Sequence, residues 1–542
     1  MRRLYVAGWL LGLIAISLPV AAQHFKVYYE FRPGQVPQHL AVHGLTASAD
    51  GKTLALAGEL KEVAPVNTAR GWTLRLKPGT ELLRVSSHYT NFNNAQNGIA
   101  VRDIALDSRA NLYIAGASVQ HFGSIGGGSE RVLSSEDLSG RMRWGQMQAN
   151  NTFESVVVDD TRQVITALSG PAQAISPLGV VVTQVDAGGH YLRDVVLRST
   201  ADDAPVRILL QERSGELIAV AVHDTATQAK PWLIWMDREL NVTASLAYQL
   251  AGYELLAADA ALAPDGRVAV AGTAIRGGIS QPFMLLVQPD GTPEACWLYA
   301  VAGGAAWGTA VSAVSNRQYE GFFVGGYTET APGRRESFLL HADISGDAHM
   351  AWDLSEFRPG DHTYDETLAR VLYMPALDRV VVTGDMARFR PNGLVDMRSV
   401  WVFQSTPDEL YSDPVREGCM QGLTVRSQAV PVGIRAIGRV TQGVSTLAFG
   451  WQQQEISFRG TYCFYESQRT GPLATPLEAG FAPELVGPGH TDIFDLSGRL
   501  ILSVPFVQTP VRPENLALAP GLYLITVNTR DVPPQTYKYL QQ

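Results

Sequence analysis

The sequence predicts an all-β protein, a seven-bladed β-propeller followed by a small C-terminal β-sandwich. Two hairpin patterns alternate between about residues 40 and 412, and glycine recurs at one place in most of the resulting units. A Pro/Gly-rich stretch then separates these units from a last group of short strands. The 542 residues exceed what one compact core usually holds, so two or three domains are expected unless an internal repeat organises the chain.

The first hairpin of each unit has an apolar strand, a polar turn and a second apolar strand that often ends at glycine. Clear copies begin at Leu45, Ile104 and Ala260, and weaker copies begin at Val156, Ile208, Val311 and Val371. The recurring glycines are Gly58, Gly116, Gly272, Gly326 and Gly384. Asp265-Gly266 predicts a tight primed turn, because Asp-Gly tolerates the positive φ that such turns require.

A second hairpin follows the first and brings each unit to four strands. These hairpins alternate with period two around an Asp or Pro turn and begin at Gly71, Gly179, Pro231, Pro282, Ser337 and Ser399, with a degraded counterpart from Arg131. Four strands in about 50 to 58 residues are typical of a propeller blade. A closed ring also removes the unpaired edges of an open stack. Six blades with one irregular insertion is the alternative.

The units resemble the bacterial β-propeller repeat family, whose signature is a strand, a "DG" turn and a strand ending "vaG". "FFVGGYTE" from Phe322 is also similar to a kelch repeat, although no other unit has a double glycine at this place in its second strand. The resemblance implies a ring of four-stranded blades. It implies no activity, because propellers host many functions.

The N-terminus predicts a signal peptide over residues 1–22. Arg2 and Arg3 give a positive start, an apolar run of about 17 residues follows, and "VAA" supplies the small residues that a signal peptidase recognises. A membrane anchor is the alternative, although the run is at the lower limit for spanning a bilayer. No later stretch reaches 18 consecutive apolar residues, so we expect an exported mature chain without a transmembrane segment.

Residues 23–412 are predicted to form the propeller, whereas residues 413–470 are β-rich without the repeat pattern. The later segment includes "GLTVRSQAV", "GIRAIGRVT" and "EISFRGTYCFYES". It forms a small module of its own, or it completes the ring together with the early strand "HFKVYYEF" of residues 24–31. The sequence leaves both possibilities open.

Three cysteines give an exported chain an odd count. Cys419 and Cys463 flank the β-rich segment, and we expect them to form a disulfide because export permits one. Cys296 lies in an apolar strand and is expected to be a buried free thiol. No CxxC or Cys/His spacing suggests zinc.

The tail, residues 471–542, ends in three β-like segments, "TDIFDLSGRLILSV", "ENLALAPGLYLITVNT" and "TYKYLQQ". Their order resembles the C-terminal (type A) sorting domain of type IX secretion system cargo of Bacteroidota. The positions that match the family's motif are Asp495, Gly498, Arg499, Gly521, Tyr523 and Lys538. The "PNP" element that often opens the family is missing, and "FAPELVGPGH" stands in its place.

The resemblance implies delivery to the medium or to the outer-membrane surface, with the type IX secretion machinery as a partner. It also implies a β-sandwich fold for the tail. The predicted signal peptide agrees with it, because this route passes through the periplasm. An ordinary C-terminal β-sandwich without an address function is the alternative.

The motifs of common catalytic centres are absent from the sequence. There is no HExxH, GxSxG, Walker A or GxGxxG, and "SADGKTLA" lacks the aromatic residue of a sialidase Asp-box. The net charge of −9, with scattered Lys and Arg, offers no basic face to nucleic acid. These absences favour a binding protein over an enzyme.

A few residues are candidates for ligand or metal binding. Asp361, Asp365 and Glu366 lie in one predicted inter-blade loop and could hold calcium, although a solvated acidic loop has the same composition. His39 and His43 border a strand, where a four-residue spacing argues against a metal pair. We expect no other cofactor. Tryptophans at strand positions could stack on sugars but are more typical of the core between blades, and they are Trp72, Trp232, Trp235, Trp297 and Trp401.

We therefore predict an exported, surface-attached or released binding protein whose propeller loops recognise a protein or a glycan. One alternative is a polysaccharide lyase or hydrolase that uses acidic residues near the central channel. The other is a structural component of the envelope or of the secretion apparatus. The side chains at the mouths of the channel distinguish these classes, because a flat apolar mouth argues against catalysis.

Overall fold

The computed structural model divides into two units, Ala22–Tyr465 and a second unit that includes Glu466–Gln542. The structure describes residues 23–31, 39–61, 69–77, 82–92, 95–119, 130–148, 152–170, 179–198, 202–225, 228–301, 304–316, 318–331, 334–355, 363–412, 421–423, 425–436, 439–441, 447–448, 451–454, 458–466, 489–494, 500–506, 521–529 and 535–541. Among these residues, no helix has the length and apolar character needed to cross a bilayer.

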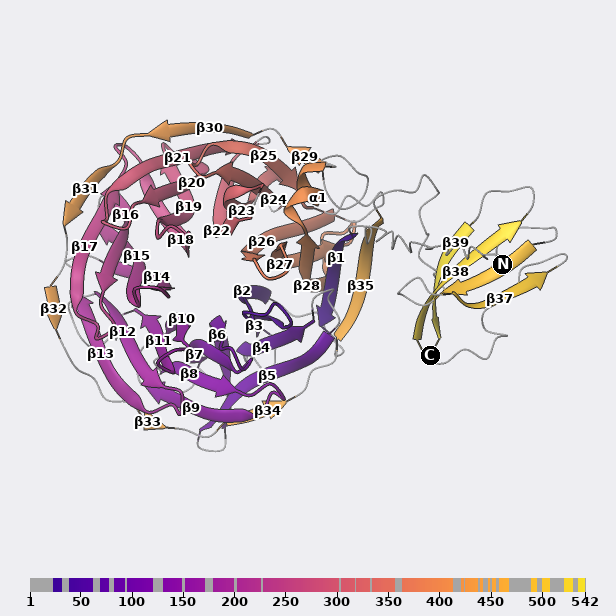
Figure 1. Ribbon diagram of the computed structural model, residues 1–542, viewed down its shortest axis with the longest axis horizontal. Helices are drawn as coiled ribbons and strands as arrows, with labels where there is room; N and C mark the ends of the chain where they lie inside the picture. The colour runs from indigo at the N-terminus through magenta and orange to yellow at the C-terminus, as the bar shows by residue number, and fades with distance from the viewer. Residues whose placement is uncertain are drawn as a thin grey trace, which may run out of the picture. The chain divides into compact units, whose positions relative to one another are not determined.

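The first unit is a seven-bladed β-propeller, as the sequence predicts, with the blades arranged around one axis (Figure 1). Each blade is built mainly from four consecutive strands. Blade 1 contains β2 (His39–Ala47), β3 (Leu54–Lys61), β4 (Ala69–Leu76) and β5 (Leu82–Phe92). Blade 2 contains β6 (Ala95–Leu106), β7 (Leu112–Val119), β8 (Glu130–Glu136) and β9 (Met142–Gln148). Blade 3 contains β10 (Phe153–Asp159), β11 (Val164–Ser169), β12 (Gly179–Asp186) and β13 (Tyr191–Arg198). Blade 4 contains β14 (Asp202–Gln211), β15 (Glu216–Thr225), β16 (Gln228–Met236) and β17 (Val242–Gln249).

The remaining blades repeat this order, with the first strand of each nearest the axis. Blade 5 contains β18 (Glu254–Leu262), β19 (Val268–Arg276), β20 (Ile279–Val287) and β21 (Pro293–Val301). Blade 6 contains β22 (Ala306–Ser315), β23 (Glu320–Ala331), β24 (Arg334–Asp343) and β25 (Ala348–Asp353). Blade 7 contains β26 (Thr363–Met374), β27 (Arg379–Phe389) and β28 (Val395–Ser405), and its fourth strand is the early strand β1 (Gln23–Phe31).

The early strand therefore closes the ring. β1 pairs antiparallel with β28, from Phe25 opposite Gln404 to Glu30 opposite Ser399. The sheets account for seven blades, so the six-blade alternative is wrong. A short helix, α1 (Pro407–Ser412), follows the last repeat strand.

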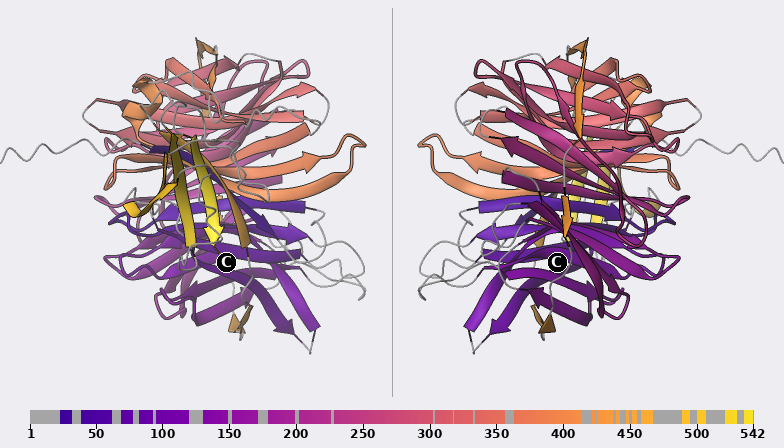
Figure 2. Two further views of the ribbon diagram at one scale, coloured as in Figure 1. Left: turned by 90° about the vertical axis from the view of Figure 1, so that its right-hand side faces the viewer. Right: turned by 90° about the vertical axis from the view of Figure 1, so that its left-hand side faces the viewer.

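The β-rich segment after α1 forms a belt around the outside of the propeller. Its strands are β29 (Gln421–Leu423), β30 (Val425–Val430), β31 (Gly433–Ala436), β32 (Arg439–Thr441), β33 (Leu447–Ala448), β34 (Trp451–Gln454) and β35 (Phe458–Glu466). They add a fifth strand to blades 6, 5, 4, 3, 2, 1 and 7 in turn, against the chain order of the blades. Figure 2 shows the ring edge-on, with these belt strands at its outer rim. Because the belt ends on β1, both ends of the unit meet in blade 7.

The hydrophobic core is divided among the junctions between blades. The described residues form seven buried clusters, each built from the facing sides of two neighbouring blades. Trp72, Trp232, Trp235 and Trp401 belong to these clusters and are at most 2% exposed, so their predicted core role is confirmed. Large aromatic rings fill the space between two sheets and favour burial over sugar contact.

Tight turns join the strands on one face of the ring, which we call the turn face. In the Asp-Gly turn of blade 5, the Ala263 N–H donates to the Arg267 carbonyl at 2.8 Å and the Gly266 N–H donates to the Ala263 carbonyl at 2.9 Å. Only Gly266 of the Asp-Gly pair has a positive φ, 90°. The primed two-residue turn predicted here is therefore wrong, and the loop is a type I turn followed by a bulge residue.

The described residues of the tail form a separate four-stranded antiparallel sheet. Its strand order is β37 (Leu500–Phe506), β36 (Gly489–Phe494), β38 (Gly521–Thr529) and β39 (Gln535–Gln541). Ile493 of the central strand β36 is fully buried. The sandwich predicted for the tail stays a prediction, because these strands make one sheet.

Candidate binding site at the propeller channel

Every blade carries a β-bulge at the same place on its inner strand. The pairing between first and second strands shifts by one residue in each blade, which leaves one inner-strand residue without a partner. In blade order, the bulge residues are His43, Arg102, Glu154, Val206, Ala258, Thr309 and Ala369. Bulges re-aim side chains and are frequent near functional sites.

The bulge side chains face the axis of the ring. The two faces of each blade pack on neighbouring blades, and all seven bulge residues are partly exposed at the inner edge of the ring, although Val206 and Ala369 also contact the core clusters. The side chains of His43, Arg102 and Glu154 are 24%, 32% and 34% exposed, whereas Val101 and Asp103, on either side of Arg102, are buried. These seven positions therefore line the central channel.

The recurring glycines of the second strands are explained by the bulges. A Cβ atom on Gly58 would lie 1.9 Å from the Ala41 carbonyl oxygen, and one on Gly384 would lie 1.8 Å from the Thr367 oxygen. The bulge pushes that carbonyl into the space that a side chain would occupy. Blades 3 and 4 have Ser169 and Ala221 at the equivalent positions.

Charged side chains converge on the channel from blades 1, 2 and 3. The Arg102 Nη1 atom lies 3.0 Å from His43 Nε2 and 3.6 Å from Glu59 Oε2, and its Nε lies 3.9 Å from Glu154 Oε2. His39 and His43 lie 3.5 Å and 3.7 Å from Glu59 Oε1. We call His43, Glu59, Arg102 and Glu154 the channel cluster.

The channel cluster holds its two carboxyl groups in different electrostatic environments. Burial raises the pKa of Glu154 above the usual value. Burial acts in the same direction on Glu59, but hydrogen bonds from His39 and His43 and the charge of Arg102 outweigh it and hold the Glu59 pKa well below its usual range. Burial and Arg102 lower the pKa of His43. Glu59 is thus the permanent anion, and Glu154 takes a proton more readily.

The channel wall of blades 4 to 7 has a different character. Its bulge residues are Val206, Ala258, Thr309 and Ala369, and none of them is charged. Leu256, two residues before Ala258, is 39% exposed. Trp307, two residues before Thr309, is partly exposed and stacks on Tyr327 with ring centroids 5.2 Å apart. The channel is therefore polar on one side and mostly apolar on the other.

A buried polar chain lies directly behind the bulges and ties blades together. Asp103 accepts hydrogen bonds from Arg207 Nη1 at 2.9 Å and from Ser155 Oγ at 2.8 Å. Arg207 Nε also lies 3.6 Å from Asp259 Oδ1. Asp103 and Asp259 are buried, and every partner comes from another blade. We assign these residues to the scaffold, because their charges pair across neighbouring blades.

The predicted acidic group is divided by the structure. Asp365 binds Arg335 in a bidentate pair, with distances of 2.8 Å and 2.6 Å. Glu366, the next residue of β26, binds Lys26 Nζ at 2.6 Å. Asp361 lies outside the described residues, and among the described ones no group of three or more potential metal-ligating side chains occurs. The calcium site stays a prediction.

The remaining candidates belong to the tail and to the cysteines. Gly521 and Tyr523 lie in β38, and Lys538 lies in the paired strand β39. Asp495, Gly498, Arg499 and Cys419 lie outside the described residues, so the sorting motif and the disulfide of Cys419 with Cys463 stay predictions. Cys296 is a buried free thiol, as expected.

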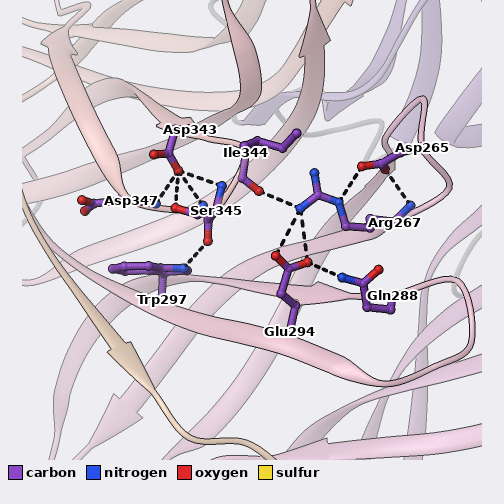
Figure 3. Close-up of polar contacts among 10 residues, drawn as sticks. Asp265, Arg267, Gln288, Glu294, Trp297, Asp343, Ile344, Ser345 and Asp347 are labelled. Carbon is purple, nitrogen blue, oxygen red and sulfur yellow. Dashed lines mark hydrogen bonds and ion pairs between the residues drawn. The ribbon is translucent and has the colours of Figure 1, made fainter.

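A second hollow, with a volume of about 400 Å³, lies on the turn face between blades 5 and 6. Arg267 contacts Asp265 at 2.7 Å, Glu294 at 3.2 Å and the Ile344 carbonyl at 2.7 Å (Figure 3). Trp297 Nε1 donates to the Ser345 carbonyl at 2.7 Å in the same group. Its central groups are engaged in joining the two blades, so the channel is the better candidate site.

The sequence analysis considered His43 only as one of a metal pair and missed the other six bulge residues, although a signal for them exists. In the five blades that keep the recurring glycine, the bulge directly follows the residue paired with it, as His43 follows Val42, the partner of Gly58. Counting back across each first hairpin from its glycine therefore finds the channel residue. Only the three-dimensional structure shows that the charged side chains of blades 1 to 3 lie close together.

No family model matches the chain, and no curated protein matches its sequence. Solved structures do resemble it. A protein of unknown function from Dyadobacter fermentans is 13% identical with a TM-score of 0.40, over 70% of this chain and 98% of that one. Drosophila Plexin A in complex with Semaphorin 1b is 8% identical with a TM-score of 0.37, over 69% of this chain and 84% of that one. Chaetomium thermophilum Sqt1 is 12% identical with a TM-score of 0.29, over 71% of this chain and 98% of that one.

Proposed function

We propose that the protein is an exported binding protein that takes a glycan at its propeller channel. The observation that carries the proposal is the departure from the repeat at the bulge positions. Residues that the fold needs recur from blade to blade, as the glycines opposite the bulges do. Charge at the bulge does not recur: His43, Arg102 and Glu154 stand where other blades have valine, alanine or threonine. Four blades fold without a charged bulge residue, so we assign the channel cluster a role other than folding.

The chemistry of the channel suits a sugar. Carboxylates and a guanidinium supply acceptors and donors for hydroxyl groups, and an apolar wall suits the C–H face of a sugar ring. The contacts of Arg102 with Glu59 and Glu154 are long, 3.6 Å and 3.9 Å, and partly exposed. Such pairs exchange partners at little cost.

A glycan array with the purified full-length chain tests this function. We expect defined glycans to bind, and we expect the double variant Arg102→Gln, Glu154→Gln to lose at least about tenfold in affinity, because charged hydrogen bonds contribute about 1.5–3 kcal/mol each. The matched control is Glu212→Gln, Arg213→Gln, the same two changes at exposed positions of the turn between β14 and β15. An array on which no glycan binds, or one on which both double variants bind like the wild type, contradicts the proposal.

Delivery by the type IX route belongs to the same proposal. It is supported by the order of the motif in the tail and by the predicted signal peptide. Deleting residues 491–542 should leave the protein in the periplasm, as measured by fractionation and immunoblotting. Appearance of the truncated protein in the medium would overturn this part.

A polysaccharide hydrolase or lyase is the second candidate, favoured by the channel cluster's two unlike carboxyl groups. Environments that push two carboxyl pKa values apart are typical of acid–base pairs. Every glycan that binds should therefore be incubated with the protein and assayed for new reducing ends and unsaturated products. Cleavage that Glu154→Gln abolishes would establish the enzyme, and intact glycan would establish the binding protein.

A further inference from the structure

Arg370 is a partly exposed residue directly behind the channel wall of blade 7, and the proposed site does not yet use it. It follows the bulge residue Ala369 on β26, the inner strand of blade 7. It lies close enough to influence both His43 and Glu154: burial is the main cause of their altered pKa values, and the positive charge of Arg370 acts to lower both. Arg370 therefore belongs to the same part of the channel as the channel cluster.

The protein contains an internal comparison for this residue. Arg207 occupies the equivalent position in blade 4 and binds two carboxylates, Asp103 at 2.9 Å and Asp259 at 3.6 Å. Arg370 is flanked at the same level by Gly44 of blade 1 and Ala310 of blade 6, which offer no polar side chain. Among the described residues, arginine at this level thus has carboxylate partners in blade 4 and none in blade 7.

The guanidinium of Arg370 has little to bind within the described protein. Its Nη1 donates to the Ala369 carbonyl at 3.3 Å, no ion pair of Arg370 within 4 Å occurs among the described residues, and its buried Nε has no hydrogen-bond partner there. A buried donor without a partner costs free energy, and the donor of Arg370 lies beside the channel cluster. Planar donors of this kind suit a carboxylate or phosphate.

The surroundings favour a carboxylate over a phosphate. Glu59 is held ionised beside Arg102, and Glu154 lies near Arg370. These carboxyl groups repel a doubly charged phosphate more strongly than a singly charged carboxylate. The carboxyl and imidazole groups of the channel cluster can bind the hydroxyls next to that carboxylate. A uronic acid carries both features on one ring.

We infer that the glycan of the channel contains uronic acid and that its carboxylate pairs with Arg370 while its hydroxyls contact the channel cluster. This inference rests on the proposed glycan-binding function and gives it a substrate class. Arg370 is a specificity-determining residue in this arrangement. Arg207, its equivalent, is a scaffold residue.

Isothermal titration of the full-length protein with two matched probes tests the inference. The probes are an α-1,4-linked galacturonate tetramer and the uncharged galactose tetramer of the same linkage. We expect the acidic tetramer to bind more tightly, and we expect Arg370→Gln to weaken it about 10- to 100-fold while leaving the neutral tetramer unchanged. Arg213→Gln, an exposed arginine of the turn between β14 and β15, should change neither.

Thermal unfolding separates this role from a structural one. Because Arg370 has no ion pair among the described residues, Arg370→Gln should shift the unfolding midpoint by less than about 2 °C, whereas Arg207→Gln should lower it by several degrees. A large loss in Arg370→Gln would overturn the inference in favour of a scaffold role. Equal binding of the two tetramers, or binding of neither while the array reports other glycans, would also overturn it and leave the proposed function standing. An array on which no glycan binds would contradict both this inference and the proposed function.

Discussion

The closing seam of blade 7 and the central channel use similar charged groups in opposite ways. At the seam, Lys26 Nζ lies 2.6 Å from Glu366 Oε2 and 2.6 Å from the Leu354 carbonyl, and both side chains are at most 1% exposed. In the channel, the distances from Arg102 to its carboxylates exceed 3.5 Å, and its side chain is 32% exposed.

The difference distinguishes a structural contact from a binding contact. A buried ion pair must be complete, because either charge alone in the interior is strongly unfavourable. A partly exposed pair is screened by water and can exchange one partner for a ligand at small cost. The seam should therefore respond to mutation in stability, and the channel should respond in affinity.

The largest expected effect is at the seam. Lys26→Met leaves Glu366 buried without its cation, and we expect a loss of about 3–5 kcal/mol in the free energy of unfolding, measured by urea denaturation. The double variant Lys26→Met, Glu366→Leu removes both charges and should recover most of that loss. A single variant as stable as the wild type would show that the pair does not hold β1 in blade 7.

The second effect is a loss of stability in acid that comes from buried histidine. His341 Nδ1 is hydrogen-bonded to the Tyr411 hydroxyl, the residue is 3% exposed, and burial lowers its pKa to about 4. The folded state thus resists a proton that the unfolded chain takes near pH 6.5, so stability is full above that pH and falls as the pH drops to about 4.

The full shift corresponds to about 3 kcal/mol at the acid end, since one pKa unit is about 1.4 kcal/mol. Unfolding free energies measured at pH 7, 6, 5 and 4 should fall for the wild type. In His341→Gln, the unfolding free energy should fall less steeply with decreasing pH. An identical slope in both proteins would assign the acid sensitivity to other groups.

The third effect concerns the glycine opposite the bulge. A Cβ on Gly384 would lie 1.8 Å from the Thr367 carbonyl oxygen and 2.7 Å from the Trp401 ring, so Gly384→Ala should cost about 1–3 kcal/mol through overpacking. Ala221→Gly in blade 4 is the matched control, and it should cost about 1–2 kcal/mol through backbone entropy and the loss of its buried methyl group. Equal costs would mean that the bulge yields to the new side chain.

The sequence predicts the ring well because its signals are local. Each hairpin, each turn and the glycine of each second strand lie within about 20 residues of one another, and the blade count follows. The belt strands could not be assigned in the same way, because several are two to four residues long and pair with strands far away in the sequence. The ring closure by β1 had to stay one of two possibilities for the same reason.

The site was predicted less completely, and the reason is again distance along the chain. Asp365 and Glu366 are adjacent, but their partners Arg335 and Lys26 lie 30 and 340 residues away. Composition marks them as an acidic loop, whereas the fold gives each its own cation. Conversely, His43, Arg102 and Glu154 have no motif in common and become one group only when three blades meet at the axis.

The smallest expected change in stability is in the channel, and it is the sharpest test of the contrast. Arg102→Gln removes two long, partly exposed ion pairs, so we expect less than about 1 kcal/mol of lost stability by urea denaturation. The same variant should lose binding to any glycan that the wild type takes, because its guanidinium is the donor shared by Glu59 and Glu154. A loss near that of Lys26→Met, with binding unchanged at temperatures where the variant is folded, would make Arg102 a scaffold residue like Arg207. A variant that is stable but deficient in binding would place the function of the propeller at the bulge positions that line its channel.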